Sequence, residues 1–158
     1  MKKKYRKFVA SAATATLVAS AIVPAVSAAS FSDTAGNTHE LAIESLVSQG
    51  IISGYPDGSF KPNRTLTRSD VVKLLGKYLV SQGYKVPADY KTNMRFTDLR
   101  STSQDELLQY AALVKDNGVF NGSNGNLLPN DSITRENMAV VLVRAYTNIN
   151  GFDYVGHV

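Results

Sequence analysis

The strongest constraint on the fold of this 158-residue chain is a repeat within its own sequence. Segments 31–79 and 96–146 align when Gly50 is placed on Gly118 and Gly54 on Gly122. After a one-residue deletion in the second copy, the Leu-Thr-Arg of residues 66–68 falls on the Ile-Thr-Arg of residues 133–135. Self-similarity at a fixed period is typical of supersecondary units that stack on one another. We therefore expect two units of about 50 residues that bury their apolar faces together.

Each unit is predicted to be helix, loop, helix. Gly50 and Gly118 follow the first helix of their units, at a position where a left-handed cap commonly ends a helix. The segments "SGYPDGSFKPN" and "NGSNGNLLPN" come next and are rich in loop-forming residues. The residues with helical spacing that predict the first helices are Ile43, Leu46 and Val47, and then Leu107, Tyr110, Ala111 and Val114.

A second, longer helix opens after Thr67 in the first unit and after Thr134 in the second. Both helices carry an apolar stripe, which is predicted to be core because an exposed stripe would be unstable. The sequence therefore predicts an all-α fold in which two helix–loop–helix repeats pack through their long second helices. The stripes consist of Val71, Leu74, Leu75, Tyr78 and Leu79, and of Met138, Val141, Leu142, Ala145 and Tyr146.

The amino end resembles an export signal. Residues 2–7 contain five basic residues, an uncharged apolar run extends from Phe8 to Ser32, and "VSAAS" offers small residues for cleavage after Ala28. These three parts together predict a secretory signal peptide over residues 1–28. An uncleaved membrane anchor is the alternative, and the serines, threonines and Pro24 within the run favour cleavage. We expect no membrane association after cleavage.

Removal of the signal peptide changes the charge of the chain. Five of its seventeen basic residues lie in residues 2–7, which leaves twelve against thirteen acidic residues, a net charge near −1. A basic surface for nucleic acid therefore has no support. The chain contains no cysteine, so an exported product would have no disulfide framework and would depend on core burial.

Both long helices begin with a Thr-Arg pair. The threonines are good N-caps, whose hydroxyl groups accept bonds from free backbone amides. Arginine is unfavourable there, because the amino end of a helix already carries roughly half a positive charge. Free amides and a guanidinium together form an anion site, whereas the alternative is an internal ion pair of Arg68 and Arg135 with Asp33 and Asp98. The residues alone leave both possibilities open.

The motifs resemble a known family. "FSD", "GIISGYPDGSFKPN" and "LTRSD" in the first unit look like the S-layer homology module of bacterial cell-surface proteins, and "FTD" with "ITREN" matches more weakly in the second. The whole precursor resembles the amino-terminal region of S-layer proteins from Bacillus-like Gram-positive bacteria. Such modules usually come in threes as a pseudo-threefold bundle, so two copies imply a partial bundle, a fragment or a truncated relative of a larger S-layer protein.

The resemblance implies noncovalent anchoring to the cell wall through a pyruvylated secondary wall polysaccharide, held in grooves between modules. The alternative function is a structural piece of a surface lattice that binds protein partners, itself or other S-layer subunits, in place of glycan. Carried onto this chain, the ligand-binding candidates are Arg68, Arg135, Thr67, Thr134, Asp33, Asp98, Gly54 and Gly122. The expected organisation is a signal peptide (1–28), module 1 (29–79), a linker (80–95), module 2 (96–146) and a tail (147–158).

No catalytic set is evident, so we expect no enzyme activity, cofactor or metal. The "YPDGSF" loop lacks the acid spacing of a calcium-binding EF-hand, and His39 and His157 have no ligand cluster around them. Tyr55, Tyr84 and Tyr90 are candidates to stack on sugar rings, whereas Tyr78 and Tyr146 are expected in the helix stripes. With only two modules, the uncovered flank of the long helices predicts self-association.

Overall fold

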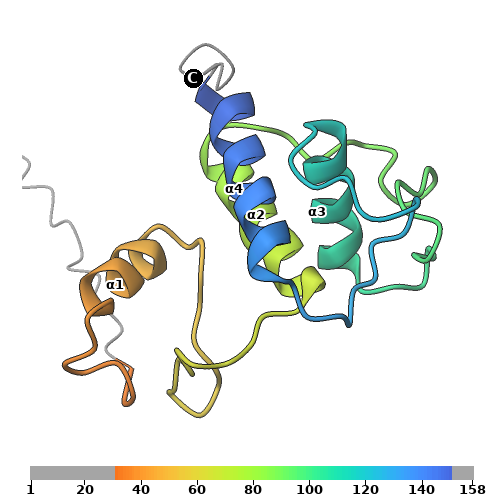
Figure 1. Ribbon diagram of the computed structural model, residues 1–158. Coiled ribbons are helices and arrows are strands. Elements are labelled where there is room, and N and C mark those ends of the chain that lie inside the picture. Colours follow the sequence, from red (N-terminus) through yellow and green to blue (C-terminus); the bar gives the residue numbers. More distant parts are fainter. Residues whose placement is uncertain (1–30, 151–158) are drawn as a thin grey trace, which may run out of the picture.

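The computed structural model describes residues 31–150, so the expected signal peptide lies outside the described residues. Within that range the chain forms four helices and no β-sheet, and the all-α prediction is confirmed (Figure 1). None of these helices combines the length and apolarity that crossing a bilayer requires. The helices are α1 (Glu40–Ser48), α2 (Arg68–Ser81), α3 (Asp105–Asp116) and α4 (Arg135–Asn150).

The helix boundaries follow the predicted signals. Gly50 and Gly118 have φ angles of 69° and 67°, the left-handed conformation expected after α1 and α3. Both long helices begin at the arginine that follows the capping threonine. Helix α4 runs to Asn150, four residues beyond the predicted end of module 2.

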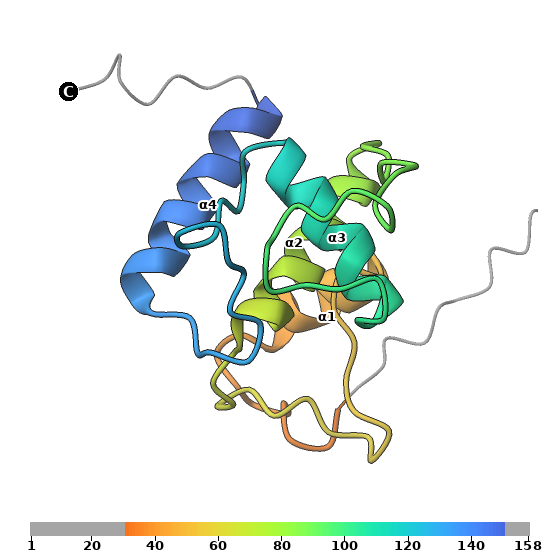
Figure 2. The ribbon, with the colours of Figure 1, turned by 90° about the vertical axis from the view of Figure 1, so that its right-hand side faces the viewer.

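The closest helix pair joins the long helix of the first repeat to the short helix of the second. Helices α2 and α3 lie side by side in both views (Figures 1 and 2). Gly76 faces the ring of Tyr110, and a Cβ atom built on this glycine would lie 2.3 Å from the tyrosine Cγ. The glycine therefore permits the close approach of the two helices. A pairing of the two long helices with each other was expected, but the nearest neighbour of α2 is α3.

Helix α4 enters the same core with only part of its apolar stripe. Val141 and Ala145 are buried among the core residues of α2 and α3, and Met138 packs against them. Leu142 is 53% exposed and Tyr146 59% exposed, so the prediction that the whole stripe is core is wrong for these two residues. Their side of α4 has no described helix packed on it, unlike the side of α2 that contacts α3.

Helix α1 lies apart from the other three helices (Figure 1). Ile43 is its one fully buried residue, and Leu41 is almost wholly exposed. The loop that follows α1 leads to α2 and leaves an open pocket between them. The pocket therefore lies where α1 is separated from α2.

The linker of residues 80–95 is fastened to α3. Arg95 binds Asp116 and Asp89 at 2.7 and 2.8 Å, and these two carboxylates raise the pKa of the guanidinium. The Tyr90 hydroxyl donates to Asp105, and the rings of Tyr84 and Tyr90 pack against the core. These two partly buried tyrosines therefore contribute to packing, and their stacking on sugar rings stays a prediction.

Replacing Gly76 by alanine tests the α2–α3 contact. An alanine in a helix interior ordinarily gains about 1 kcal/mol over glycine. Here the added methyl group must displace the Tyr110 ring, so we expect a net loss of about 1–3 kcal/mol in the free energy of unfolding, measured in urea. The double variant Gly76→Ala/Tyr110→Ala should lose less than the sum of the two single variants. Additive losses would show that the two side chains are not coupled.

Candidate functional site

The aspartates of the two opening motifs fasten the loops of their repeats. The carboxylate of Asp33 accepts bonds from the backbone amides of Phe60 and Lys61, both at 2.8 Å. These bonds, chiefly the one from Phe60, hold the pKa of Asp33 below its usual value. Lys61 has a φ of 59°, an unfavourable backbone conformation for a side chain, which the carboxylate helps to stabilise.

Asp98 makes the same contact in the second repeat. Its carboxylate accepts from the amides of Leu127 at 2.8 Å and Leu128 at 2.7 Å, and Leu128 has a φ of 56°. Neither Asp33 nor Asp98 pairs with Arg68 or Arg135 in the described part of the chain. The ion-pair alternative for these arginines is therefore wrong.

Gly54 and Gly122 pack against the phenylalanines of the opening motifs. A Cβ on Gly54 would lie 2.1 Å from the ring of Phe31, and one on Gly122 would lie 2.7 Å from the ring of Phe96. The absence of a side chain at both glycines therefore lets the phenylalanine rings pack directly against the loop backbone.

The two threonines cap their helices as predicted. The Thr67 hydroxyl accepts from the Asp70 amide, and the Asp70 carboxylate accepts from the Thr67 amide at 2.9 Å, which completes a capping box. In the second repeat the Thr134 hydroxyl accepts from the Asn137 amide at 3.1 Å. Asp70 also pairs with Arg64, so the cap of α2 fixes the position of a second arginine.

Arg68 crosses from the first repeat into the second. Its side chain is only 7% exposed. Nε donates to the carbonyl oxygen of Leu127 at 2.6 Å, and the guanidinium carbon lies 5.0 Å from the centroid of the Phe120 ring. The amides of Arg68 and Ser69 donate to the carbonyls of Asp131 and Pro129. The amino end of α2 is thus seated on the loop of the next repeat.

Arg135 occupies the corresponding place at the start of α4 but is exposed. Its side chain makes no hydrogen bond, ion pair or ring contact with the residues that the structure describes. The repeat therefore places its two equivalent arginines in opposite environments: one is buried between repeats and the other faces solvent.

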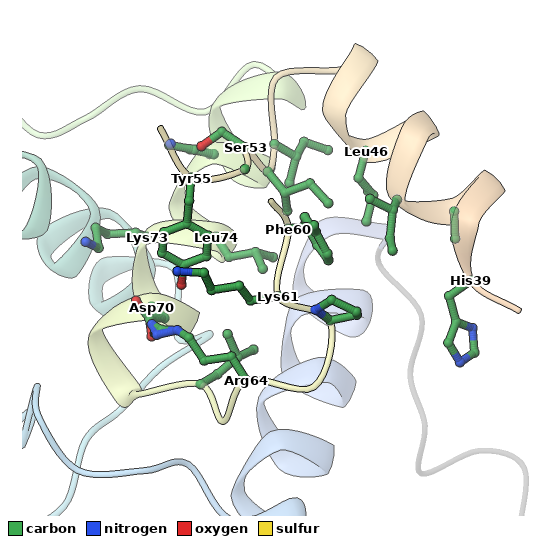
Figure 3. A pocket seen from close by; sticks show the side chains of 18 of the residues that line it. His39, Leu46, Ser53, Tyr55, Phe60, Lys61, Arg64, Asp70, Lys73 and Leu74 are labelled. Carbon is green, nitrogen blue, oxygen red and sulfur yellow. The ribbon is translucent and has the colours of Figure 1, made fainter. Parts of the chain in front are cut away.

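The first repeat contains an open pocket of about 620 Å³ between α1, the following loop and α2. Figure 3 shows Leu46 and His39 on the α1 side and a polar group on the α2 side. Gly54 and Phe60 also line the pocket, which links the motif loop to the cavity. The polar group on the α2 side consists of Tyr55, Lys61, Arg64, Asp70 and Lys73.

This α2 side is positively charged. Lys61 Nζ lies 4.1 Å from the centroid of the Tyr55 ring, and the guanidinium of Arg64 lies 5.8 Å from it. Lys61 and Arg64 each have an acidic partner, Asp57 and Asp70 respectively.

Lys73 differs from these two cations. Its Nζ reaches only the Gln104 side-chain oxygen, at 3.5 Å, and forms no ion pair within residues 31–150. Lys77, one turn further along α2, pairs with Glu106. Lys73 is thus a lysine without an acidic partner among the described residues, and it lies in a pocket where it could form a charge-assisted hydrogen bond with an anion.

Sequence reasoning singled out Tyr55 but missed Lys61, Arg64 and Lys73. The spacing of Lys73 and Lys77, four residues apart on α2, was the available signal, because such residues share one helix face. No sequence pattern indicated that Lys61 and Arg64 line the pocket, because their position depends on how the loop folds back over α2.

The two repeats, each a helix, an aspartate-fastened loop and a capped longer helix, define a tandem helical module. The S-layer homology domain family matches residues 30–72 and 95–139. The chain belongs to this family, whose modules anchor surface-layer proteins to the cell wall.

Among its relatives, the surface-layer 125 kDa protein of Lysinibacillus sphaericus is 35% identical over 147 residues, 90% of this chain and 12% of the relative. The S-layer protein EA1 of Bacillus anthracis is 32% identical over 93% of this chain and 17% of its own length. An amylopullulanase of Thermoanaerobacterium thermosulfurigenes is 32% identical over 73% of this chain but only 6% of that enzyme. The chain therefore spans a small part of each relative, and the S-layer matches agree with secretion to the cell wall.

The contrast between the two arginines gives a matched test. Arg68→Ala removes a buried charge-assisted hydrogen bond and should lower the free energy of unfolding by about 1.5–3 kcal/mol. Arg135→Ala, at the equivalent exposed position, should change it by less than about 0.5 kcal/mol. Arg68→Lys should not restore stability, because lysine lacks the planar N–H group that reaches Leu127. Equal losses for both alanine variants in denaturant titrations would contradict the assignment.

The lowered pKa of Asp33 predicts a pH-dependent contribution to stability. A carboxyl group with a depressed folded-state pKa stabilises the fold above its unfolded value, and the effect is lost as pH falls through the folded value. Asp33→Asn should therefore lower the melting temperature at neutral pH, and the difference from wild type should shrink below pH 3.8. Asp131→Asn, at an exposed acid whose side chain forms no described ion pair, is the control and should show little difference at either pH.

Proposed function

We propose that this chain anchors its protein to the bacterial cell wall by binding a pyruvylated secondary wall polysaccharide in the pocket of the first repeat. The observation that carries the proposal is the uncompensated Lys73 in a 620 Å³ pocket beside Arg64 and Tyr55. After the expected cleavage of residues 1–28, the chain has a net charge near −1. The positive charge of the pocket is therefore opposite in sign to the net charge of the chain.

The pocket chemistry suits an acidic sugar. A pyruvate ketal places a carboxylate on a compact sugar ring. Lys73 supplies a point charge for that carboxylate, and Arg64 has donors beyond the one that binds Asp70. The Tyr55 ring offers an aromatic surface to the sugar and already carries Lys61 above it. One cavity thus offers both cations for the carboxylate and an aromatic ring for the sugar.

The second repeat lacks these groups. The residues that align with Tyr55, Lys61, Arg64 and Lys73 are Ser123, Leu128, Asp131 and Val140. The proposed glycan site is therefore confined to the first repeat, although the two loops are fastened in the same way by Asp33 and Asp98.

The motif residues support this site from different places. Asp33 and Gly54 shape the loop wall, and Thr67 holds Asp70, which in turn holds Arg64. Direct ligand contact by Arg68 or Arg135 stays a prediction, and Arg135 has the exposed side chain that such contact needs. The corresponding residues Asp98, Gly122 and Thr134 shape the second repeat.

The alternative function is self-assembly through protein contacts. It is supported by the exposed apolar residues of α4, namely Val140, Leu142 and Val143.

Sedimentation with purified cell-wall sacculi tests the glycan proposal. Wild-type chain should sediment with intact sacculi and stay in solution after acid removal of the secondary polymer. Lys73→Gln and Arg64→Gln should each weaken binding by about tenfold, because each removes a charge-assisted contact of about 1.5 kcal/mol.

Arg100→Gln is the matched control, since this exposed arginine lies outside the pocket and has no side-chain partner among the described residues. It should bind like wild type. Undiminished binding by folded Lys73→Gln and Arg64→Gln, or equal binding to stripped sacculi, would refute the proposal.

A further inference from the structure

The contact between the repeats shows how one long helix seats on a neighbouring repeat. Arg68 lies over the ring of Phe120 and donates to the carbonyl of Leu127, while Ser69 donates to the carbonyl of Pro129. Phe120 and Leu127 are fully buried as a result. The loop of the second repeat is therefore a socket that the amino end of α2 fills.

The first repeat has a corresponding socket with different side chains, and no described helix end fills it. Ile52 aligns with Phe120, Phe60 with Leu127 and Pro62 with Pro129, and all three line the 620 Å³ pocket. Ile52 and Phe60 are only partly buried, unlike their counterparts. The aspartate-bound part of the loop is equivalent in both repeats, because Asp33 and Asp98 bind corresponding amides. Part of this pocket therefore corresponds to the space that the amino end of α2, with Arg68, fills at the second repeat.

The second repeat supplies a matching helix end. Arg135, the counterpart of Arg68, is exposed at the start of α4. On α2 the residues that meet α3 include Lys73 and Gly76, through Gln104 and Tyr110. Their counterparts on α4 are two exposed valines, Val140 and Val143. Helix α4 therefore presents the face that α2 uses to join the next repeat, and no helix among residues 31–150 covers it.

The sizes of the side chains at the expected crossing are complementary. In the observed contact a small residue on the long helix, Gly76, meets a large one on the short helix, Tyr110. At the counterpart positions the long helix α4 carries Val143 and the short helix α1 carries Ala42, which lines the open pocket. In this second pair the larger residue is on the long helix and the smaller one on the short helix, the reverse of the observed pair. The side-chain sizes therefore allow α4 and α1 to approach closely.

We propose that α4 of one molecule docks head to tail on α1 and the first loop of a second copy, with Arg135 entering its pocket between Ile52 and Phe60. Within one molecule α1 and α4 lie apart, so the contact is between molecules (Figure 1). Such a contact is heterologous, and two of them can close a dimer of four repeats. Arg135 enters at the loop residues Ile52 and Phe60, in the same pocket that carries the proposed glycan cations on its α2 side (Figure 3). The contact between copies needs no glycan to form, so its test is independent of the proposed function.

A mixing experiment tests this contact. Sedimentation velocity of the mature chain from about 1 to about 100 micromolar should show a monomer giving way to a species of twice its mass. Val143→Asp destroys the helix face and keeps the socket, and Ala42→Asp does the reverse. Each variant alone should remain monomeric. Mixed together, they should form a one-to-one pair, because each retains the half that the other lacks. Arg135→Ala should weaken association by about tenfold.

Val80→Asp is the matched control. Val80 is 44% exposed, as Val143 is, but it lies at the end of α2, outside the proposed contact. This variant should associate like wild type, and melting curves should show all variants folded. A wild-type chain that stays monomeric throughout the range would overturn the proposal. So would association of both aspartate variants alone, or failure of the folded pair to combine while wild type associates.

Discussion

The fold depends on the close approach of α2 and α3, which belong to different repeats. A helix–loop–helix unit of this length cannot cover both of its helices from within, so α2 finds its partner in the next unit. Gly76 allows the Tyr110 ring to lie against the helix backbone, and Arg68 joins the amino end of α2 to the loop of the second repeat. The buried residues Val72, Leu75 and Leu79 lie along this helix. The main buried core therefore combines α2 of the first repeat with residues of the second repeat.

This arrangement makes the two repeats unequal despite their similar sequences. The second repeat receives a helix end on its loop, and its core closes around Phe120 and Leu127. The first repeat receives none among the described residues, so α1 stands apart and a pocket remains. The first repeat is consequently the one with an open pocket, and the second is the one whose long helix has a face that no described helix covers. The proposed wall-binding site and the proposed contact with another copy both follow from this one-directional contact.

The two Thr-Arg pairs illustrate how position changes the role of a motif. An arginine next to a helix amino end is unfavourable in isolation. The side chain of Arg68 extends from its own helix to the carbonyl oxygen of Leu127 in the other repeat. There the hydrogen bond and the face of the Phe120 ring stabilise its charge. Arg135 has the same local sequence but no neighbour of this kind within the described residues. The aspartates that seemed natural partners bind backbone amides and hold the loops in shape.

The sequence by itself determined the repeat, the four helices, their glycine and threonine caps and the family, because periodicity and capping depend on residues close together in the chain. Tertiary structure alone decided which helix packs on which, since that depends on contacts such as the one between Gly76 and Tyr110, 34 positions apart. It also decided that Leu142 is exposed and Arg68 buried, although helical spacing predicted Leu142 as core and the residues left Arg68 open. The pocket cations Lys61, Arg64 and Lys73 come together only when the loop folds over α2, because no local pattern links the loop to that face of the helix.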